Sequence, residues 1–257
     1  MSTSDRLLAI LGLFTVERPD WSVEEAGVTL GLASSTAYRY FQSLNRSGLL
    51  TSFGVGRYVL GPTIIRYDWQ LRLTDPMISA CRFEMDRIAK MASGEIVAFL
   101  CRLYDDQVMC VHQASVNDPH FALGYERGRP MPLFRGSASK VILANIPARH
   151  LRALYRNHAT NFADAGLGLD WSEVRANVRK LRSDGYCITN EEVDRGMRGI
   201  SVPLPSIGNG ILGSLSIAGP RKYLSQAKTK LLLSELQSSV RRVEKAQLFE
   251  ARRVIAA

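Results

Sequence analysis

The chain has 257 residues, of which 46% are hydrophobic and 22% are charged. This balance can bury a core, so it excludes an intrinsically disordered chain, and the length suits either one large domain or two modest ones. Lysine and arginine outnumber aspartate and glutamate by 33 to 24, and the formal net charge is +9. Such a charge favours a polyanionic partner, although by itself it also fits any basic soluble protein.

The sequence also argues against membranes, disulfides and metals. It contains no run of about 20 apolar residues, the length needed to cross a bilayer, and its N-terminus lacks the order of a secretion signal. We therefore expect a cytoplasmic protein with no membrane partner and no cofactor. The four cysteines are scattered through apolar runs, so we predict buried core thiols and neither a disulfide framework nor a metal site.

Three helices are predicted before residue 50. Apolar residues recur at helical spacing over residues 5–14, which predicts the first helix. Ser22 stands three residues ahead of Glu25, the arrangement of a capping box, so a second helix begins there. The hydroxyl residues 34–36 offer caps for a third helix, which we expect to end near Gly48.

A hairpin follows the third helix. Residues 49–53 and 57–60 are predicted strands joined by a glycine turn, and three helices followed by a hairpin is the order of a winged helix-turn-helix. No aspartate or glutamate lies between Glu25 and Asp68, although four arginines do. A surface that faces phosphates needs this absence of carboxylates. The alternative is a small structural helical module with incidental arginines.

A helical segment at residues 63–73 is interpreted as a linker helix, and Asp75-Pro76 is a strong helix break and restart. We therefore place a winged helix-turn-helix domain at residues 1–62, a linker helix at 63–75 and a second domain at 76–257.

The second domain alternates helices and strands. Predicted strands lie at 95–104, 107–114, 121–125, 186–189, 199–203 and 213–217, with Gly208-Asn209-Gly210 turning before the last of them. Predicted helices lie at 76–92, 139–144, 148–155 and 172–182, followed by an amphipathic basic tail at 223–255. Helices on a largely antiparallel sheet give an α+β class. The tail is interpreted as a solvated helix, with a dimer surface or an accessory DNA contact as alternatives.

Two groups of motifs lie along the chain. The first half contains residues 35–44, Gly48-Leu49-Leu50 and 58–61. The second half contains residues 128–133, 184–186, Glu191-Glu192, 196–198, Pro203 and 215–220. Together these motifs resemble the IclR family of bacterial transcription regulators. The resemblance implies an N-terminal winged helix-turn-helix, a linker helix and a C-terminal GAF-like effector-binding and oligomerisation domain with a mainly antiparallel sheet, assembled as a homodimer or homotetramer on DNA.

The resemblance nominates DNA-binding residues on the recognition helix and the wing. They are Ser34, Ser35, Thr36, Tyr38, Arg39, Arg46 and Arg57. Arg39 either pairs with a guanine edge or clamps a phosphate. Ser35 and Thr36 either touch phosphates or cap the helix, and the cap is favoured for Ser35. Arg57 either contacts the DNA backbone or minor groove or is a solvated hairpin charge.

The resemblance also nominates an effector pocket. Its candidate residues are Arg129, Phe134, Ser137, Ala138, Thr189, Gly199, Ser216 and Ala218. Family members that hold small oxo-acids present an acidic residue at the position of Thr189 and a cysteine at that of Gly199. Because Gly199 removes side-chain volume and Phe134 adds apolar surface, we expect a larger, flatter effector, an aromatic or bulky organic acid. Arg129 or Arg135 is the candidate partner of its carboxylate, or else a surface arginine.

Two other classes of function were weighed. An enzyme is disfavoured because the sequence has no HExxH, GxSxG, Walker or dinucleotide pattern, and we name no catalytic residue. The alternative is a ligand-free oligomerising DNA-binding scaffold protein, with contacts from the helix of Trp69 and the basic tail. We predict a repressor or activator whose paired recognition helices bind an inverted-repeat operator in double-stranded DNA, with half-sites about 10 base pairs apart or a multiple of that.

Overall fold

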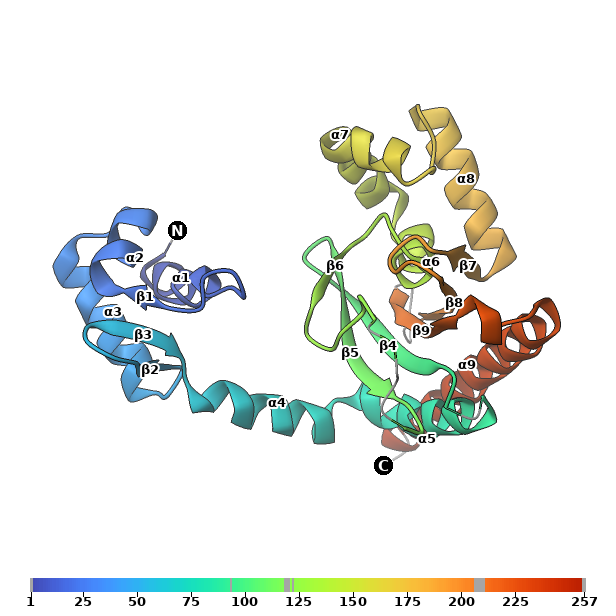
Figure 1. Ribbon diagram of the computed structural model, residues 1–257, viewed down its shortest axis with the longest axis horizontal. Helices are drawn as coiled ribbons and strands as arrows, with labels where there is room; N and C mark the ends of the chain where they lie inside the picture. Colours follow the sequence, from blue (N-terminus) through green and yellow to red (C-terminus); the bar gives the residue numbers. More distant parts are fainter. Residues whose placement is uncertain (1, 93, 118–120, 122, 206–210, 256–257) are drawn as a thin grey trace. The chain divides into compact units, whose positions relative to one another are not determined.

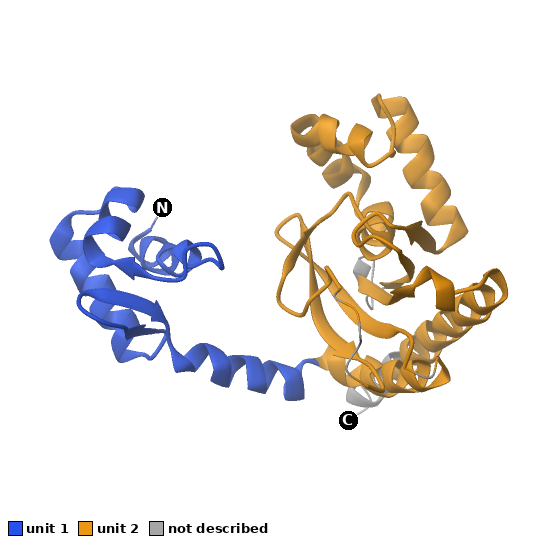
Figure 2. Ribbon diagram, in the orientation of Figure 1, with its two compact units in different colours: residues 1–75 blue, residues 76–257 orange. Residues whose placement is uncertain are grey.

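The computed structural model describes residues 2–92, 94–117, 121, 123–205 and 211–255. The chain divides into two compact units, residues 1–75 and 76–257, coloured separately in Figure 2. Each unit buries its own hydrophobic cluster, and the second unit has two of them. In the described part of the chain no helix is long and apolar enough to span a bilayer.

The first unit is a winged helix-turn-helix, as predicted. Its helices are α1 (Thr3–Ala9), α2 (Val23–Leu30) and α3 (Ser34–Arg46), and the 3-10 turn η1 (Leu11–Leu13) follows α1. Its strands are β1 (Trp21–Ser22), β2 (Leu50–Ser52) and β3 (Arg57–Leu60), in an antiparallel sheet of order β1-β3-β2. The predicted first helix therefore ends early, next to the poor helix former Gly12, and the two-residue strand β1 is too short to have been predicted.

Local signals in the sequence set the ends of α2. The Ser22 hydroxyl accepts a hydrogen bond from the Glu25 amide, and the Glu25 carboxylate accepts one from the Ser22 amide, both at 3.2 Å. Gly31 ends the helix with a φ of 62°, a left-handed conformation that favours glycine. The predicted capping box is confirmed.

The core of the first unit forms where α3 packs on the other elements. Its buried members are Ile10, Trp21, Val23, Ala26, Ala37, Tyr40, Phe41, Leu44 and Leu50. Tyr40 and Phe41 are 5% and 0% exposed, so both are the core anchors that the apolar stripe of the helix predicts.

Helix α4 (Pro62–Thr74) is the predicted linker helix, and it begins against the end of α3. The Thr63 hydroxyl donates a hydrogen bond to the Ser47 carbonyl at 2.9 Å, and the Thr63 amide donates one to the Gly48 carbonyl at 3.0 Å. Gly61 is needed for this approach, since an added Cβ would lie 2.2 Å from the Gly48 oxygen. No described residue of α4 is buried.

The second unit is built on a six-stranded antiparallel sheet of order β6-β5-β4-β9-β8-β7. Its strands are β4 (Val97–Tyr104), β5 (Gln107–Ala114), β6 (Pro130–Pro132), β7 (Cys187–Asn190), β8 (Met197–Pro205) and β9 (Ile211–Pro220). Its helices are α5 (Pro76–Met91), α6 (Ser137–Asn145), α7 (Ala148–Asp164), α8 (Trp171–Asp184) and α9 (Gln226–Ile255), with the 3-10 turn η2 (Arg221–Tyr223) before α9.

Helices cover both faces of the sheet, as Figure 1 shows. Successive residues of β4 point to opposite faces: Phe99 and Cys101 join the cluster under α6, α7 and α8, whereas Ala98 and Leu100 join the cluster under α5 and α9. All four cysteines are buried and free, which confirms the prediction of core thiols.

Two predictions about elements of the second unit are wrong, and one lies outside the described residues. Residues 121–125 form no strand in their described part, because the Gly124 amide bonds to the Asp194 carboxylate and the Tyr125 carbonyl to the Gln113 side chain. Helix α9 is not a solvated tail, since it buries an apolar face in the sheet's second cluster. The predicted turn Gly208-Asn209-Gly210 falls in the undescribed stretch.

Candidate functional site

The recognition helix α3 presents an outward face that is polar and free of acidic residues. Its exposed residues include Ser34, Ser35, Tyr38, Arg39, Gln42, Ser43 and Arg46. Tyr38 is 55% exposed although it is aromatic. Residues 26–67 contain no aspartate or glutamate, so this face carries no carboxylate of its own that would repel a polyanion.

The prediction that Ser35 caps α3 is wrong. The helix begins at Ser34, and the N-cap is Ala33, whose backbone is extended and whose carbonyl accepts hydrogen bonds from the Thr36 and Ala37 amides. No side chain caps this end. The hydroxyl residues therefore lie inside the first turn, where Ser34 and Ser35 are exposed and Thr36 is half-buried.

The arginines of the first unit differ in their surroundings. Among the described residues, neither Arg39 nor Arg46 has an acidic partner, and the Arg39 guanidinium lies 5.9 Å from the Tyr40 ring centroid. Arg57, on β3, is instead held by the carboxylates of Asp20 and Glu25. These two acids raise the pKa of Arg57, Asp20 being the larger cause. Arg57 thus joins the wing to the start of α2.

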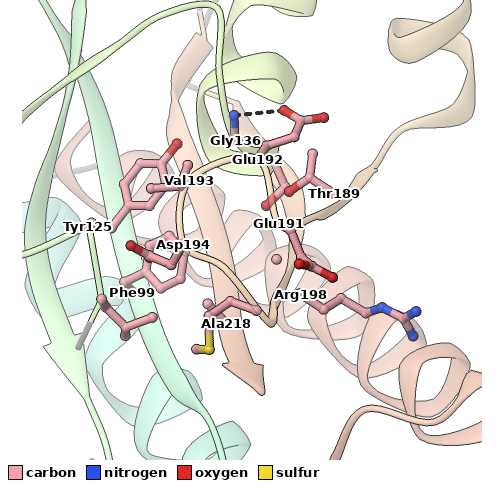
Figure 3. A pocket seen from close by; sticks show the side chains of 14 residues that line it. Phe99, Tyr125, Gly136, Thr189, Glu191, Glu192, Val193, Asp194, Arg198 and Ala218 are labelled. Atoms are coloured by element: carbon pink, nitrogen blue, oxygen red, sulfur yellow. Dashed lines mark hydrogen bonds between the residues drawn. The ribbon is translucent and has the colours of Figure 1, made fainter. Parts of the chain in front are cut away.

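A small cavity opens in the second unit between the sheet, the start of α6 and the connection from β7 to β8 (Figure 3). Its volume is about 30 Å³. Its lining residues are Phe99, Leu123, Tyr125, Gly136, Ser137, Thr189, Glu191, Glu192, Val193, Asp194, Met197, Arg198, Gly199 and Ala218. Figure 3 shows the rings of Phe99 and Tyr125 on one side, with Asp194 beside them, and Glu191 and Glu192 of the β7–β8 connection on the other.

The structure brings some of the predicted pocket residues to this cavity. Ser137, Thr189, Gly199 and Ala218 line it. Gly199 does not create open space, because an added Cβ there would lie 2.6 Å from the Ser137 Oγ. Position 199 must lack a side chain because α6 and β8 approach each other closely here. The Ser201 hydroxyl of β8 donates a hydrogen bond to the Ser137 hydroxyl of α6 at 2.7 Å.

The other predicted pocket residues do not line the cavity. Phe134 packs in the core, with its ring 4.8 Å from that of Phe162. Ala138 and Ser216 are fully buried, and the Ser216 hydroxyl donates to that of Ser214 at 3.3 Å. Arg129 is exposed. Arg135, the other candidate for a carboxylate partner, donates a hydrogen bond to the Glu192 carbonyl at 2.5 Å.

An ion pair that the sequence analysis missed lies beside the cavity. The Lys140 ammonium donates to the Glu192 carboxylate at 2.7 Å and to the Ala165 carbonyl at 3.1 Å. The Lys140 side chain is 10% exposed, so its charge is largely removed from water. A signal was present in the sequence, because a single lysine in the apolar helix 137–145 needs an anionic partner.

Burial favours the neutral form of two further groups in this region, Tyr125 and Cys187. Burial raises the pKa of the Tyr125 phenol, whose oxygen lies 3.0 Å from the Ser139 hydroxyl and donates to the Arg135 carbonyl. Burial likewise raises the pKa of the Cys187 thiol to about 12. Since the thiolate is the nucleophilic form of cysteine, this burial disfavours a nucleophilic role for Cys187.

Comparisons with known proteins match both units. The model "IclR helix-turn-helix domain" matches residues 3–52, and the model "Bacterial transcriptional regulator IclR C-terminal" matches residues 74–245. The HTH-type transcriptional regulator BhcR of Paracoccus denitrificans is 26% identical over 226 residues, which cover 87% of this chain and 79% of BhcR.

Solved structures share the fold. An IclR family transcriptional regulator from Brucella abortus is similar with a TM-score of 0.77 at 21% identity, covering 96% of this chain and 92% of that one. An IclR homolog from Microbacterium hydrocarbonoxydans, complexed with 4-hydroxybenzoate, gives a TM-score of 0.69 at 19% identity, covering 95% and 98%. Because the C-terminal family model alone spans more than half of the chain, the protein belongs to the IclR family: it is a transcriptional regulator with a DNA-binding helix-turn-helix and a C-terminal effector domain.

Proposed function

We propose that the protein binds an inverted-repeat operator in double-stranded DNA as a homodimer, or as a homotetramer of such dimers. A small aromatic organic acid bound in the second unit modulates this binding. We assign the protein a binding role and not a catalytic one, in line with relatives that are transcriptional regulators. Such a ligand shifts DNA binding only by its differential affinity for the two states of the protein.

The observation that supports DNA contact is the outer face of α3. It exposes Arg39 and Arg46 without acidic partners among the described residues, together with the hydroxyls of Ser34 and Ser35. Arginine, serine and helix N-termini supply most contacts to phosphates, and an arginine also pairs with guanine edges. We therefore assign base or phosphate contact to Arg39 and phosphate contact to Arg46.

A salt series tests this assignment. Binding of a fluorescent DNA fragment from upstream of the protein's own gene is measured by anisotropy between about 50 and 200 mM salt. We expect affinity to fall steeply with salt, and Arg39→Ala to reduce the slope by about 1 or to relax the sequence preference. Arg6→Ala, which removes the same charge from the exposed face of α1, is the matched control. A flat salt response, or an Arg39→Ala protein with unchanged slope and preference, contradicts the assignment.

The support for an aromatic acid comes from the cavity lining and from one relative. The rings of Phe99 and Tyr125 stack with centroids 5.2 Å apart and an interplanar angle of 21°. The Microbacterium homolog was solved with 4-hydroxybenzoate. Calorimetric titration of the full chain with 4-hydroxybenzoate tests the proposal. We expect binding that Ala218→Leu abolishes, since this substitution fills the cavity wall.

The second candidate is a ligand-free oligomerising DNA-binding scaffold. The small volume of the cavity, about 30 Å³, favours it. A scaffold binds DNA with the same salt dependence, but its affinity for DNA is unchanged by every acid tested. Titration of the protein–DNA complex with aromatic acids therefore separates the two candidates.

A further inference from the structure

The connection from β7 to β8, residues 191–196, forms a flap over the cavity. It is a folded segment: the Glu191 amide donates to the Met197 carbonyl at 2.8 Å, and the Met197 amide donates to the Asp194 carbonyl at 3.2 Å. The backbone is left-handed at both ends, with φ of 57° at Glu191 and 75° at Gly196.

Val193 at the centre of the flap takes up the space that a ligand needs. An added Cβ at Gly124 would lie 2.6 Å from one Val193 methyl, and an added Cβ at Gly136 would lie 2.9 Å from the other. The cavity left beside it is about 30 Å³. Sites for small molecules measure ~300 to 1,000 Å³, so an aromatic ring enters only when Val193 leaves.

The flap is fastened on both sides of Val193 by carboxylates. The Glu192 carboxylate accepts hydrogen bonds from the Lys140 ammonium at 2.7 Å and from the Gly136 amide at 3.1 Å, the latter drawn in Figure 3. The Asp194 carboxylate accepts one from the Gly124 amide at 2.8 Å. Two donors, one of them charged, converge on Glu192, which is the arrangement that recognises a carboxylate.

The burial of Lys140 makes opening of the flap depend on charge. Its side chain is 10% exposed and Glu192 is its acidic partner, so moving the flap away leaves a largely buried ammonium without a counter-ion. Removing one member of a buried ion pair is strongly unfavourable. Exchanging the carboxylate member for another carboxylate keeps the pair and avoids this cost. A ligand that brings its own carboxylate restores the pair, and a neutral ligand of the same shape does not.

From this geometry we infer that Glu192 is a built-in carboxylate ligand, and that an acid effector binds by replacing it on Lys140 and Gly136 and displacing the flap with Val193. The inference rests on the proposed function, because it requires an acid effector in this pocket. It makes Lys140 the residue that selects acids and Glu192 the residue that sets the affinity.

Calorimetric titration of the full chain with 4-hydroxybenzoate and with its neutral analogue 4-hydroxybenzamide tests the selection. We expect the wild type to bind the acid and not the amide, and Glu192→Gln to bind the acid at least 10-fold more tightly because the internal competitor has lost its charge. We expect Lys140→Met to lose the preference for the acid. Glu126→Gln is the matched control, since Glu126 is an exposed glutamate of the segment that precedes β6.

Amide hydrogen exchange of residues 191–196 gives a readout that does not depend on affinity. Without ligand, we expect faster exchange in Glu192→Gln than in the wild type or Glu126→Gln. Adding 4-hydroxybenzoate to the wild type should also speed exchange of the flap, because the flap is displaced. A ligand that binds under a closed flap would instead slow it.

The outcomes distinguish failure of the inference from failure of the proposed function. If the wild type binds the acid but the flap becomes protected and Glu192→Gln binds no more tightly, the replacement of Glu192 is refuted and the acid effector stands. If neither the wild type nor Glu192→Gln binds any aromatic acid, the proposed effector is refuted, and the inference with it. Equal exchange in Glu192→Gln and the wild type refutes the fastening role of Glu192.

Discussion

The hydroxyl of Thr63, in the first turn of the linker helix α4, donates a hydrogen bond to the carbonyl of Ser47, the C-cap of the recognition helix α3, at 2.9 Å. The Thr63 amide bonds to the next carbonyl along the chain, that of Gly48. The end of α3 and the start of α4 are therefore joined by one main-chain and one side-chain hydrogen bond.

Thr63→Val should loosen this joint. The change removes one hydrogen bond, and we expect a loss of about 0.5–1.5 kcal/mol in the stability of the first unit. Thr74→Val is the control, because the Thr74 hydroxyl bonds to Gln70 within α4 and joins no second element. Differential scanning calorimetry of the full chain measures both. An equal effect of the two substitutions would show that the joint adds nothing beyond an ordinary hydrogen bond.

Arg57→Ala should distinguish two roles of Arg57, an ion pair within the first unit and a contact to DNA. Arg57 is engaged by Asp20 and Glu25, so its loss removes an exposed ion-pair network, and such networks contribute little to stability. We expect a slightly lower unfolding temperature and an unchanged salt dependence of DNA binding, in contrast to Arg39→Ala. A salt slope lowered by about 1 in Arg57→Ala would show instead that Arg57 contacts a phosphate.

The second unit should lose stability in acid through Glu84 on α5. Hydrogen bonds from Arg242 of α9, and then from Arg87, hold the pKa of this buried carboxyl at about 2, below its ordinary value of 4.5. A carboxyl whose pKa is lower in the folded than in the unfolded state stabilises the fold at pH values above its unfolded-state pKa. This stabilisation is lost as the pH falls from about 4.5 to about 2. The effect is on the order of 3 kcal/mol.

Urea unfolding between pH 6 and pH 2.5 measures this loss. In Glu84→Gln the pH dependence should shrink, because the group that titrates is gone, while stability at pH 6 falls as Arg87 and Arg242 lose a partner. The remaining carboxylate of Glu235, which also contacts both arginines and has a lowered pKa, accounts for the residual slope. An identical pH profile in wild type and Glu84→Gln would refute the assignment.

Trp69→Glu should weaken self-association. Helix α4 has no buried described residue, and it exposes Ile65, Trp69, Leu71 and Leu73, each by more than half. Exposed apolar side chains gathered on one helix are typical of an interaction surface, and we propose a second copy as the partner. Sedimentation equilibrium should give a dissociation constant at least 10-fold higher for Trp69→Glu than for Gln70→Glu, which is the control on the same helix. Equal association of the two variants would place the contact elsewhere.

Local signals predicted most elements of the fold correctly. The Ser22–Glu25 capping box and the glycine at position 31 bound α2, and the strands predicted at 95–104 and 107–114 correspond to β4 and β5. The start of α3 was misjudged because three hydroxyl residues in a row each satisfy the local rule for a cap. Only the extended backbone of Ala33 decides among them.

The interior of the pocket could not be predicted from local patterns. Nothing in the spacing of Glu191-Glu192 indicates that Glu192 reaches a lysine 52 residues earlier in the chain. The missing side chain at Gly199 predicts free volume in the pocket, but Ser137 of α6 already fills the space next to Gly199. Both outcomes depend on how the sheet and α6 meet, which is a property of tertiary packing and not of spacing along the sequence.

The ion pairs between α5 and α9 also bear on the order of folding during synthesis. Arg87 and Glu235 are separated by 148 residues, and the apolar cluster between their helices closes only when α9 has joined it. At ~5–20 residues per second, the ribosome needs on the order of 10 s to make that interval. The cluster of the first unit is made entirely of residues synthesised before this interval, whereas Met77, Ile78 and Met85 of α5 lack their last partner, α9, until the interval ends.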